Sequence, residues 1–234
     1  MVEAKFTLAP SLNEKVATVK ESVLTSAHPL RQTRFTTSAN LVRELPPEEG
    51  AEVAFAGRSN AGKSSALNTL CDHSQLARVS KTPGRTQLLN VFGVSEGARL
   101  IDLPGYGYAK VPGAMRDHWR SELQRYFDER ESLKGLILVM DIRHPLKEFD
   151  LQMLEFCAHR LLPCHVLLTK ADKLGRGAQS ATAAQVRKQL KELTQPTTVQ
   201  TFSMPARIGI DEARTVVCGW LGLAMPEMPR KETV

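Results

Sequence analysis

The chain has 234 residues, of which 42% are hydrophobic, 24% charged and 6% aromatic. These proportions are typical of a globular protein and exclude a disordered or collagen-like chain. No stretch approaches the roughly 18 consecutive apolar residues that a membrane helix needs, and charged or polar residues interrupt every apolar run near the amino terminus. We therefore expect a cytoplasmic protein with no membrane span and no secretion signal.

The net charge is +6, from 31 lysine and arginine residues against 25 aspartate and glutamate residues. The basic excess lies in two blocks, 51–100 and 151–200, and such local surpluses favour an anionic partner. No cysteine belongs to a CxxC pair or has a histidine at zinc-ligand spacing, so we expect reduced, inert thiols and no structural metal site.

The first 50 residues carry the weakest pattern: a candidate helix at 16–24, a candidate strand at 35–41 and a proline- and glycine-rich break at 46–50. Strand-like and helix-like stretches then alternate. The expected strands are 51–56, 87–94, 99–103, 135–140, 165–169 and 198–202, and the expected helices are 63–71, 115–130, 147–160, 182–193 and 211–221. This alternation predicts an α/β fold with a largely parallel sheet and helices on both faces.

The strongest motif is the segment 57–64, GRSNAGKS, which fits the phosphate-loop pattern GxxxxGK[ST]. It follows an expected strand and precedes an expected helix, which is the context that this pattern requires. Glycines let backbone N–H groups approach phosphate oxygens, and the helix amino terminus adds the positive end of its dipole. Lys63 is expected to reach the β- and γ-phosphates, and the Ser64 hydroxyl is expected to bind Mg²⁺.

Two later segments indicate the nucleotide and the reaction. Residues 102–105, DLPG, end an expected strand, which places the Asp102 carboxylate where it can hold a metal ion through water. The Gly105 N–H can then sense a γ-phosphate. Residues 169–172, TKAD, look like a guanine-reading element, in which Asp172 accepts hydrogen bonds from the guanine N1–H and 2-amino group. Adenine lacks this pair of donors, so the carboxylate discriminates between the bases.

The polar segment 80–87 lies between the first two motifs and is suited to ordering around a γ-phosphate. It offers two hydroxyl groups as the second protein ligand of Mg²⁺. Thr86 is favoured over Thr82, because Thr86 directly precedes the strand expected to begin at Gln87.

Five segments together resemble the EngB (YihA/YsxC) family of bacterial GTPases of the translation-factor class: GRSNAGKSS (57–65), PGRTQ (83–87), DLPGYGYA (102–109), MDIRHP (140–145) and TKAD (169–172). The resemblance implies a Ras-like P-loop GTPase domain at 35–222, with a mixed, mostly parallel six-stranded sheet, an amino-terminal extension at 1–34 and a flexible tail at 223–234. It also implies GTP binding, slow GTP hydrolysis, a role in assembling the large ribosomal subunit, and a requirement for normal cell division and septation.

Carried over by position, the resemblance assigns the site residues. The metal ligands are Ser64 and Thr86, and the catalytic residues are Lys63, Thr86 and Gly105. The Lys170 stem is expected to pack over the base and the Ser203 backbone to lie near the guanine oxygen. The nucleotide-binding residues are Gly57, Arg58, Ser59, Asn60, Ala61, Gly62, Lys63 and Ser64 in the phosphate loop, Gly84, Arg85, Thr86, Gln87 and Leu88 in the first switch, Asp102, Leu103, Pro104 and Gly105 in the second switch, and Thr169, Lys170, Ala171, Asp172, Phe202, Ser203 and Met204 around the base.

The residues that would activate water differ from those of Ras-type enzymes, which use a glutamine directly after DxxG. This chain has Tyr106 there, so we expect slow hydrolysis that a partner accelerates. In some relatives of this class, an asparagine at the position of Asn60 ligates a K⁺ ion that replaces an arginine finger, which makes K⁺ a candidate cofactor. The alternative is that Asn60 simply suits a turn. Asp141 is expected to hold a turn after the central strand.

Basic residues of the first switch region and of the segment 173–191 are candidates to grip rRNA phosphates of a large-subunit precursor, and the alternative for the second group is a solvated helix face. They are Arg78, Lys81, Arg85, Lys173, Arg176, Arg187, Lys188 and Lys191. The leading interpretation is a monomeric switch that binds GTP or GDP with Mg²⁺ and acts on ribosomal RNA and proteins. Two alternatives stay open: a small-molecule P-loop kinase, and a nucleotide-binding scaffold without turnover.

Overall fold

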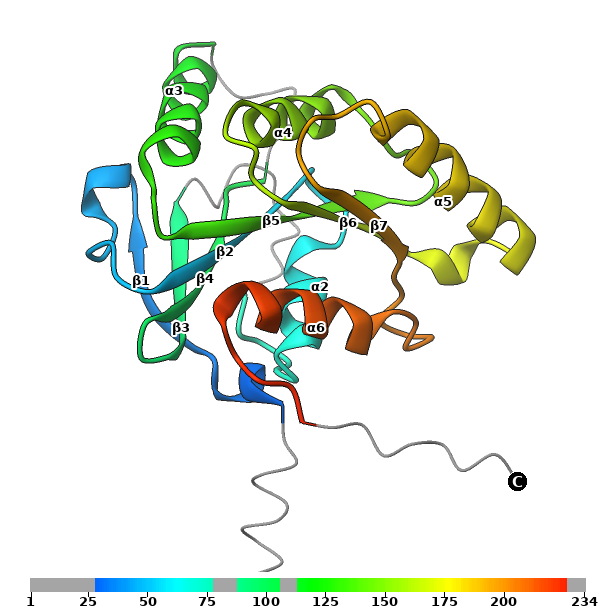
Figure 1. Cartoon of the computed structure of the whole chain (residues 1–234), viewed down its shortest axis with the longest axis horizontal. Coiled ribbons are helices and arrows are strands. Elements are labelled where there is room, and N and C mark those ends of the chain that lie inside the picture. The colour runs from blue at the N-terminus through cyan, green and yellow to red at the C-terminus, as the bar shows by residue number, and fades with distance from the viewer. Residues whose placement is uncertain (1–27, 78–87, 106–112, 227–234) are drawn as a thin grey trace, which may run out of the picture. The chain divides into compact units, whose positions relative to one another are not determined.

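The structure is a computed structural model that describes residues 28–77, 88–105 and 113–226. The expectations for the helix at 16–24, the segment 80–87 and Tyr106 lie outside the described residues. Within the unit Pro29–Ala224, seven strands form one sheet in the order β1-β3-β4-β2-β5-β6-β7 (Figure 1). The strands are β1 (Arg34–Ala39), β2 (Ala51–Gly57), β3 (Leu89–Ser95), β4 (Ala98–Asp102), β5 (Leu133–Asp141), β6 (Cys164–Thr169) and β7 (Thr197–Thr201).

The sheet is mixed, because β3 is antiparallel to both of its neighbours while β4, β2, β5, β6 and β7 run parallel. The prediction of a mixed, mostly parallel sheet is confirmed, but the expected number of six strands is wrong. The seventh is β1, which pairs with β3 at the edge of the sheet. It ends at Ala39 rather than at residue 41, because the Glu44 carboxylate accepts hydrogen bonds from the N–H groups of Asn40 and Leu41 and turns the chain into a short 3₁₀ helix.

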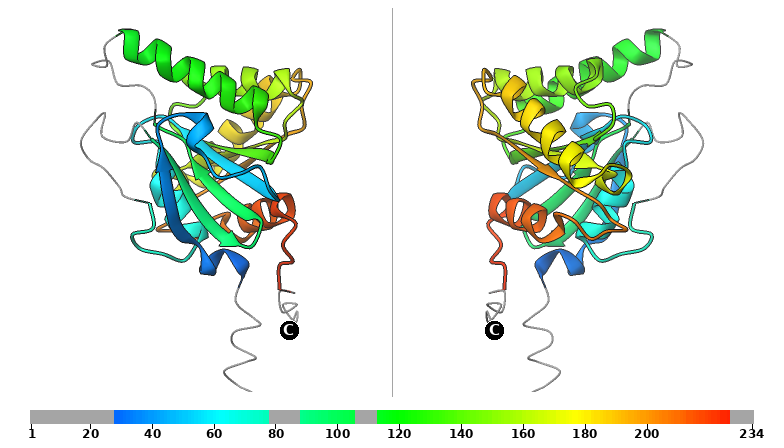
Figure 2. Two further views of the ribbon diagram at one scale, coloured as in Figure 1. Left: turned by 90° about the vertical axis from the view of Figure 1, so that its left-hand side faces the viewer. Right: turned by 90° about the vertical axis from the view of Figure 1, so that its right-hand side faces the viewer.

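Helices cover both faces of the sheet, as the alternating pattern predicted. α3 (Gly113–Glu129), α4 (Glu148–His159) and α5 (Arg176–Leu190) lie on one face, and α2 (Lys63–Leu70) and α6 (Ile210–Leu221) lie on the other (Figures 1 and 2). The sequence placed the start of α5 six residues too late. Its first two turns contain no large apolar residue, so the helical spacing becomes visible only where Ala183, Val186 and Leu190 are buried.

The core lies on both faces of the sheet. β5 is buried at every position from Gly135 to Met140, which confirms the prediction of a strand covered on both sides. Trp220 of α6 packs on Gly135 so closely that a Cβ atom there would come within 2.4 Å of the indole ring. The four cysteines are free and buried, and burial raises the pKa of Cys71 to about 12, in agreement with inert thiols. No helix in the described part of the chain is long and apolar enough to cross a membrane.

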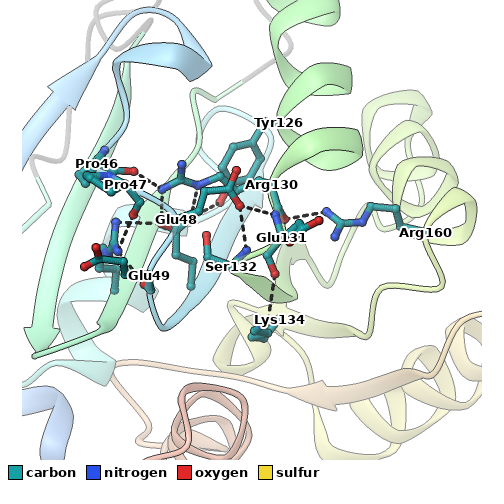
Figure 3. A network of polar contacts seen from close by, with 12 residues as sticks. Pro46, Pro47, Glu48, Glu49, Tyr126, Arg130, Glu131, Ser132, Lys134 and Arg160 are labelled. Atoms are coloured by element: carbon teal, nitrogen blue, oxygen red, sulfur yellow. Dashed lines mark hydrogen bonds and ion pairs between the residues drawn. The ribbon is translucent and has the colours of Figure 1, made fainter.

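A polar network fixes the amino end of β2 (Figure 3). Its centre is Glu52, whose side chain is fully buried and forms ion pairs with Arg130 at 2.7 Å and with Arg99 at 3.3 Å. Arg130 also donates to the carbonyl oxygen of Pro46 at 2.6 Å. In the same network, the Glu48 carboxylate accepts hydrogen bonds from the backbone N–H groups that precede β5. The start of β2 is therefore tied to the end of α3 and to the loop at 46–49.

Candidate nucleotide-binding site

The phosphate loop connects the carboxyl end of β2 to the first turn of α2. Asn60 and Gly62 adopt left-handed backbone conformations, with φ angles of 62° and 98°, which asparagine and glycine tolerate best. Gly57 lies against β5, where a Cβ atom would come within 2.7 Å of the Val139 carbonyl oxygen. The loop is therefore a tight turn that ends at a helix amino terminus, and this geometry suits a phosphate group.

Lys63 and Asp102 form a buried ion pair at this edge of the sheet. Lys63 is the first residue of α2 and Asp102 is the last residue of β4, and the two side chains are 10% and 6% exposed. The pairing of β2 with β4 places Asp102 beside Phe55, two residues before the phosphate loop begins. The structure thus brings the ammonium predicted to bind phosphate to the carboxylate predicted to lie near the metal ion.

The side chains around this ion pair fit Mg²⁺, which prefers oxygen ligands. Ser64 directly follows Lys63 in the first turn of α2 and is half-buried. Its hydroxyl group would hold the ion. The described residues contain no cluster of three or more histidine, cysteine, aspartate or glutamate side chains that would suit a different metal centre. When bound, Mg²⁺ would offset phosphate charge. Thr86, the expected second ligand, lies outside the described residues.

The DLPG segment runs beside the phosphate loop. The Leu103 N–H donates to the Phe55 carbonyl oxygen at 2.9 Å and extends the pairing of β4 with β2 by one residue. A Cβ atom on Gly105 would lie 3.7 Å from the Gly57 carbonyl oxygen and 3.8 Å from the Ser59 nitrogen. Gly105 therefore lies next to the first turn of the loop, where a switch segment could sense a bound phosphate.

Two side chains of the TKAD segment reach the phosphate loop from the carboxyl end of β6. The buried Thr169 hydroxyl lies within hydrogen-bond distance of the carbonyl oxygens of Ala61 and Met140. The Lys170 ammonium donates to the Asn60 carbonyl oxygen at 2.6 Å. Threonine at the first position of the segment thus joins the two loops through its hydroxyl group.

The base-reading carboxylate is held by a second loop. Ser203 Oγ donates to Asp172 Oδ1 at 2.7 Å, and this hydrogen bond, together with Lys173, holds the pKa of Asp172 below its usual range. Asp172 is therefore charged at neutral pH, as an acceptor for guanine must be. The sequence had predicted only a backbone role for Ser203. The Met204 side chain is 49% exposed. It therefore does not extend from the core into the space that a base would occupy.

Asp141, at the end of β5, has a larger role than its predicted turn. Its carboxylate does hold that turn, because it accepts the backbone N–H of Arg143 at 3.0 Å. It also accepts two hydrogen bonds from the Arg143 guanidinium, at 2.9 and 2.6 Å, and one from the Lys170 ammonium at 2.9 Å. The Arg143 guanidinium holds the pKa of Asp141 well below its usual range. One feature of the sequence indicated that Asp141 belongs to the site. It directly follows the expected strand 135–140, which ends at the same sheet edge as the phosphate loop.

Asp150 was also absent from the expected site. It lies in the first turn of α4 with 1% of its surface exposed, and one carboxylate oxygen accepts the Lys147 N–H at 2.9 Å. The other oxygen has no hydrogen-bond partner among the described residues. Burial raises the pKa of Asp150 to about 6, against smaller lowering effects of the hydrogen bond from the Lys147 N–H and of the Arg58 charge. Asp150 and Arg58 both line a cavity of about 240 Å³, together with Asn60 and Lys170.

The structure brings most of the predicted site residues to one edge of the sheet. The phosphate loop, the DLPG segment, the TKAD segment and the loop at 202–204 all follow the carboxyl ends of parallel strands, which is where open α/β sheets bind ligands. Leu88 precedes β3 and is 37% exposed. The other first-switch residues, Gly84, Arg85, Thr86 and Gln87, lie outside the described residues.

Comparison with known proteins identifies the family of this site. Residues 52–170 match the family model described as "50S ribosome-binding GTPase". A "probable GTP-binding protein EngB" of Stenotrophomonas maltophilia is 58% identical over 195 residues, which are 83% of this chain and 98% of that protein. A protein of the same name in Xanthomonas campestris is 57% identical over 195 residues, covering 83% of this chain and 94% of that protein.

Solved structures agree on the fold. The crystal structure of a probable GTP-binding protein engB superimposes with a TM-score of 0.58 at 20% identity, covering 74% of this chain and 99% of that one. The translation elongation factor SelB of Methanococcus maripaludis gives a TM-score of 0.52 at 15% identity over 80% of this chain and 37% of that one. The phosphate loop and the TKAD segment are joined at one sheet edge, and the relatives are 57–58% identical. This chain therefore belongs to the EngB family of GTP-binding proteins and is a GTPase of the Ras-like fold.

Proposed function

We propose that this chain is a switch that binds GTP or GDP with Mg²⁺ through the residues described above, hydrolyses GTP slowly, and acts in the cytoplasm on the large ribosomal subunit during its assembly. Normal cell division and septation would require this chain. The GTPase domain would span 35–222, with an extension at 1–34 and a tail at 223–234. The chain would act as a monomer.

One observation carries the nucleotide part of the proposal: the 2.6 Å hydrogen bond from the Lys170 ammonium to the Asn60 carbonyl oxygen. It joins the loop that suits phosphates to the segment that suits guanine. Asp172, two residues further on, is held as a charged acceptor by Ser203. A P-loop kinase for small molecules would use the phosphate loop and Lys63 but would not require this acceptor, so the arrangement favours a guanine nucleotide.

The decisive experiment measures the binding of GDP, GTP and ATP in the presence of Mg²⁺ by calorimetry, for the wild-type chain and for Asp172→Asn. We expect guanine nucleotides to bind the wild type and to lose about 100-fold in affinity in the variant, since the charged acceptor of two hydrogen bonds is changed. Xanthosine diphosphate, which has a carbonyl group in place of the 2-amino group, is the matched control and should bind the variant more tightly than the wild type. Equal binding of GTP and ATP by the wild type would favour the kinase instead.

Slow hydrolysis follows from the residue after the DLPG segment, because Tyr106 cannot orient an attacking water as glutamine does. We expect a basal turnover below about 10⁻² per second, and single-turnover phosphate release with and without ribosomal subunits should show acceleration by the subunit. No phosphate release in either condition would favour a scaffold without turnover. The left-handed conformation of Asn60 suits a turn, and a comparison of turnover in K⁺ and Na⁺ decides whether it also serves a K⁺ ion.

The ribosomal part of the proposal is supported by the description of the matching family model and by exposed basic residues on α5. The structure reduces the predicted basic group, because Arg187 donates to the Val199 carbonyl oxygen and Lys173 pairs with Asp172. Three exposed cations remain on or next to α5 that form no side-chain hydrogen bond or ion pair with the described residues. They are Arg176, Lys188 and Lys191.

Co-sedimentation with large-subunit precursors at several salt concentrations tests this surface. Replacing the three cations by glutamate should weaken binding by about tenfold or more and reduce the slope of log affinity against log salt by about 2, since each phosphate contact releases counterions. The matched control is a triple of exposed cations elsewhere, Arg43→Glu, Arg120→Glu and Lys134→Glu. Equal losses in both triples would show a general effect of net charge and would remove α5 from the proposed interface.

A further inference from the structure

We infer that Asp141 is a positioning residue for nucleotide binding, which acts by holding the Lys170 side chain against the phosphate loop. The inference rests on the proposed function, because it concerns the same nucleotide site. It assigns to this carboxylate a role beyond the turn that it forms with Arg143. The observation behind it is that a single ammonium group bridges the phosphate loop and the loop that follows β5.

The Lys170 ammonium lies between two acceptors from different loops. It donates to the Asn60 carbonyl oxygen at 2.6 Å and to Asp141 Oδ2 at 2.9 Å. The Lys170 backbone has a φ of 58°, in the left-handed region that a lysine seldom adopts. Both the backbone and the end of this side chain are thus held in one arrangement, although a free lysine side chain is among the most flexible in proteins.

Asp141 can hold Lys170 because it is itself fixed. Its Oδ1 accepts the backbone N–H and the Nε of Arg143, and its Oδ2 accepts an Nη of the same residue. The guanidinium therefore binds the carboxylate in a two-nitrogen fork within a turn of three residues, which leaves little freedom to rotate. The register of β5 and β6 places Asp141 directly beside Thr169, the residue before Lys170. Strand pairing and the Arg143 fork together aim the second carboxylate oxygen at the ammonium.

The consequence for binding is preorganisation. If the Lys170 stem covers the base, as the proposed function requires, its ordering has to be completed before or during binding. An ammonium already held at both acceptors removes that entropic cost from the binding step. The Asn60 carbonyl group alone would hold the ammonium through a neutral acceptor, whereas Asp141 adds a charged one that is only 15% exposed. Loss of Asp141 should therefore speed nucleotide dissociation.

The test is a double-mutant cycle with Asp141→Asn and Lys170→Met, read as the affinity for GDP and its dissociation rate. We expect Asp141→Asn to weaken GDP binding by about tenfold, mainly through faster dissociation. In the Lys170→Met background the same change should have almost no further effect, because its target is gone. Equal effects in both backgrounds would overturn the inference, since Asp141 would then act independently of Lys170.

Two controls separate this role from a structural one and from the proposed function. Arg143→Met removes the guanidinium fork but keeps the carboxylate and the backbone hydrogen bond of the turn, so it should show part of the loss of Asp141→Asn, about threefold in GDP affinity, and almost no further loss in the Lys170→Met background. A loss of the same size in both backgrounds would show that the turn, rather than the lysine, matters. Asp128→Asn replaces an exposed aspartate on α3 and should match the wild type. If the wild type itself failed to bind GDP, the proposed function would be wrong, whereas an additive cycle would refute only the role of Asp141.

Discussion

The two ends of β2 each lie beside a buried ion pair, but the pairs are built differently. At the amino end, Glu52 faces two arginines, and Arg130 approaches it with two nitrogens at 2.7 and 3.1 Å. At the carboxyl end, the Lys63 ammonium faces Asp102. A guanidinium fork fixes both partners in direction, whereas a lysine ammonium is a point charge on a flexible stem with three donors. The amino end is therefore suited to permanent contact and the carboxyl end to exchange of partners.

This difference shows how one strand serves both stability and binding. A buried charge is costly unless its hydrogen bonds are satisfied, and at the amino end the loop carbonyl of Pro46 accepts the further Arg130 donor. Arg160 adds to the same end by donating to the carbonyl oxygens of Phe127, in the last turn of α3, and of Arg130, directly after it. At the carboxyl end, the flexible Lys63 stem would let the ammonium turn from Asp102 to the phosphate of the proposed nucleotide without disturbing the strand behind it.

The largest effect should come from Glu52→Gln. The change leaves the Arg130 and Arg99 guanidinium groups without a buried counter-charge, and loss of one partner of such a pair costs about 3–5 kcal/mol of unfolding free energy. Denaturant unfolding measures the loss. The folded fraction should bind GDP with wild-type affinity, because the network lies at the opposite edge of the sheet from the phosphate loop.

The matched control is Arg125→Gln, which breaks an exposed ion pair with Glu129 one helical turn away on α3. Solvent screens such exposed pairs, so they contribute little to the free energy of unfolding, and the variant should unfold close to the wild type. If Glu52→Gln cost no more than this control, the amino end would not be the permanent anchor that its geometry indicates.

At the carboxyl end we expect the opposite balance from Asp102→Asn. The Lys63 stem can carry its ammonium toward solvent, so the unfolding free energy should fall by only about 1–2 kcal/mol. The Mg²⁺-dependent part of GTP affinity should fall by about 100-fold, since a carboxylate near the proposed metal site is lost. Calorimetry with and without Mg²⁺ separates the two effects. A stability loss as large as that of Glu52→Gln would contradict the proposed exchange of partners.

The sequence predicted this sheet edge because its chemistry lies in contiguous segments. The phosphate loop, DLPG and TKAD each follow a strand whose apolar run is readable, and parallel strands bring such segments together. Contacts between side chains were not predictable in the same way. Asp141 and Lys170 are 29 residues apart, and Glu52 and Arg130 are 78 apart, so strand register and helix packing decide whether they meet. The edge strand β1 was found, but its place beside β3 gives a seventh strand that the resemblance did not imply.

The smallest expected effect on stability comes from Asp150, which can be compared with the buried carboxylate of Glu52. Asp150 is also buried, but it lies near the phosphate loop and one of its oxygens has no hydrogen-bond partner among the described residues. Burial raises the pKa of Asp150 to about 6, above the ordinary value of an aspartate side chain near 3.8. The folded state thus holds this proton more tightly than the unfolded state, so its contribution to stability is present below about pH 4 and is lost as the pH rises through 6.

Asp150→Asn should therefore become more stable than the wild type as the pH rises from about 4 to 7. The shift corresponds to at most about 3 kcal/mol, and the new amide group, which lacks an acceptor, offsets part of it, leaving about 1 kcal/mol at pH 7. Denaturant unfolding at several pH values measures the difference. Asp211→Asn, at an exposed aspartate in the first turn of α6, is the matched control for the loss of one carboxylate. A constant difference between Asp150→Asn and the wild type across this range would mean that Asp150 is charged throughout, and that Arg58 neutralises it as fully as Arg130 neutralises Glu52.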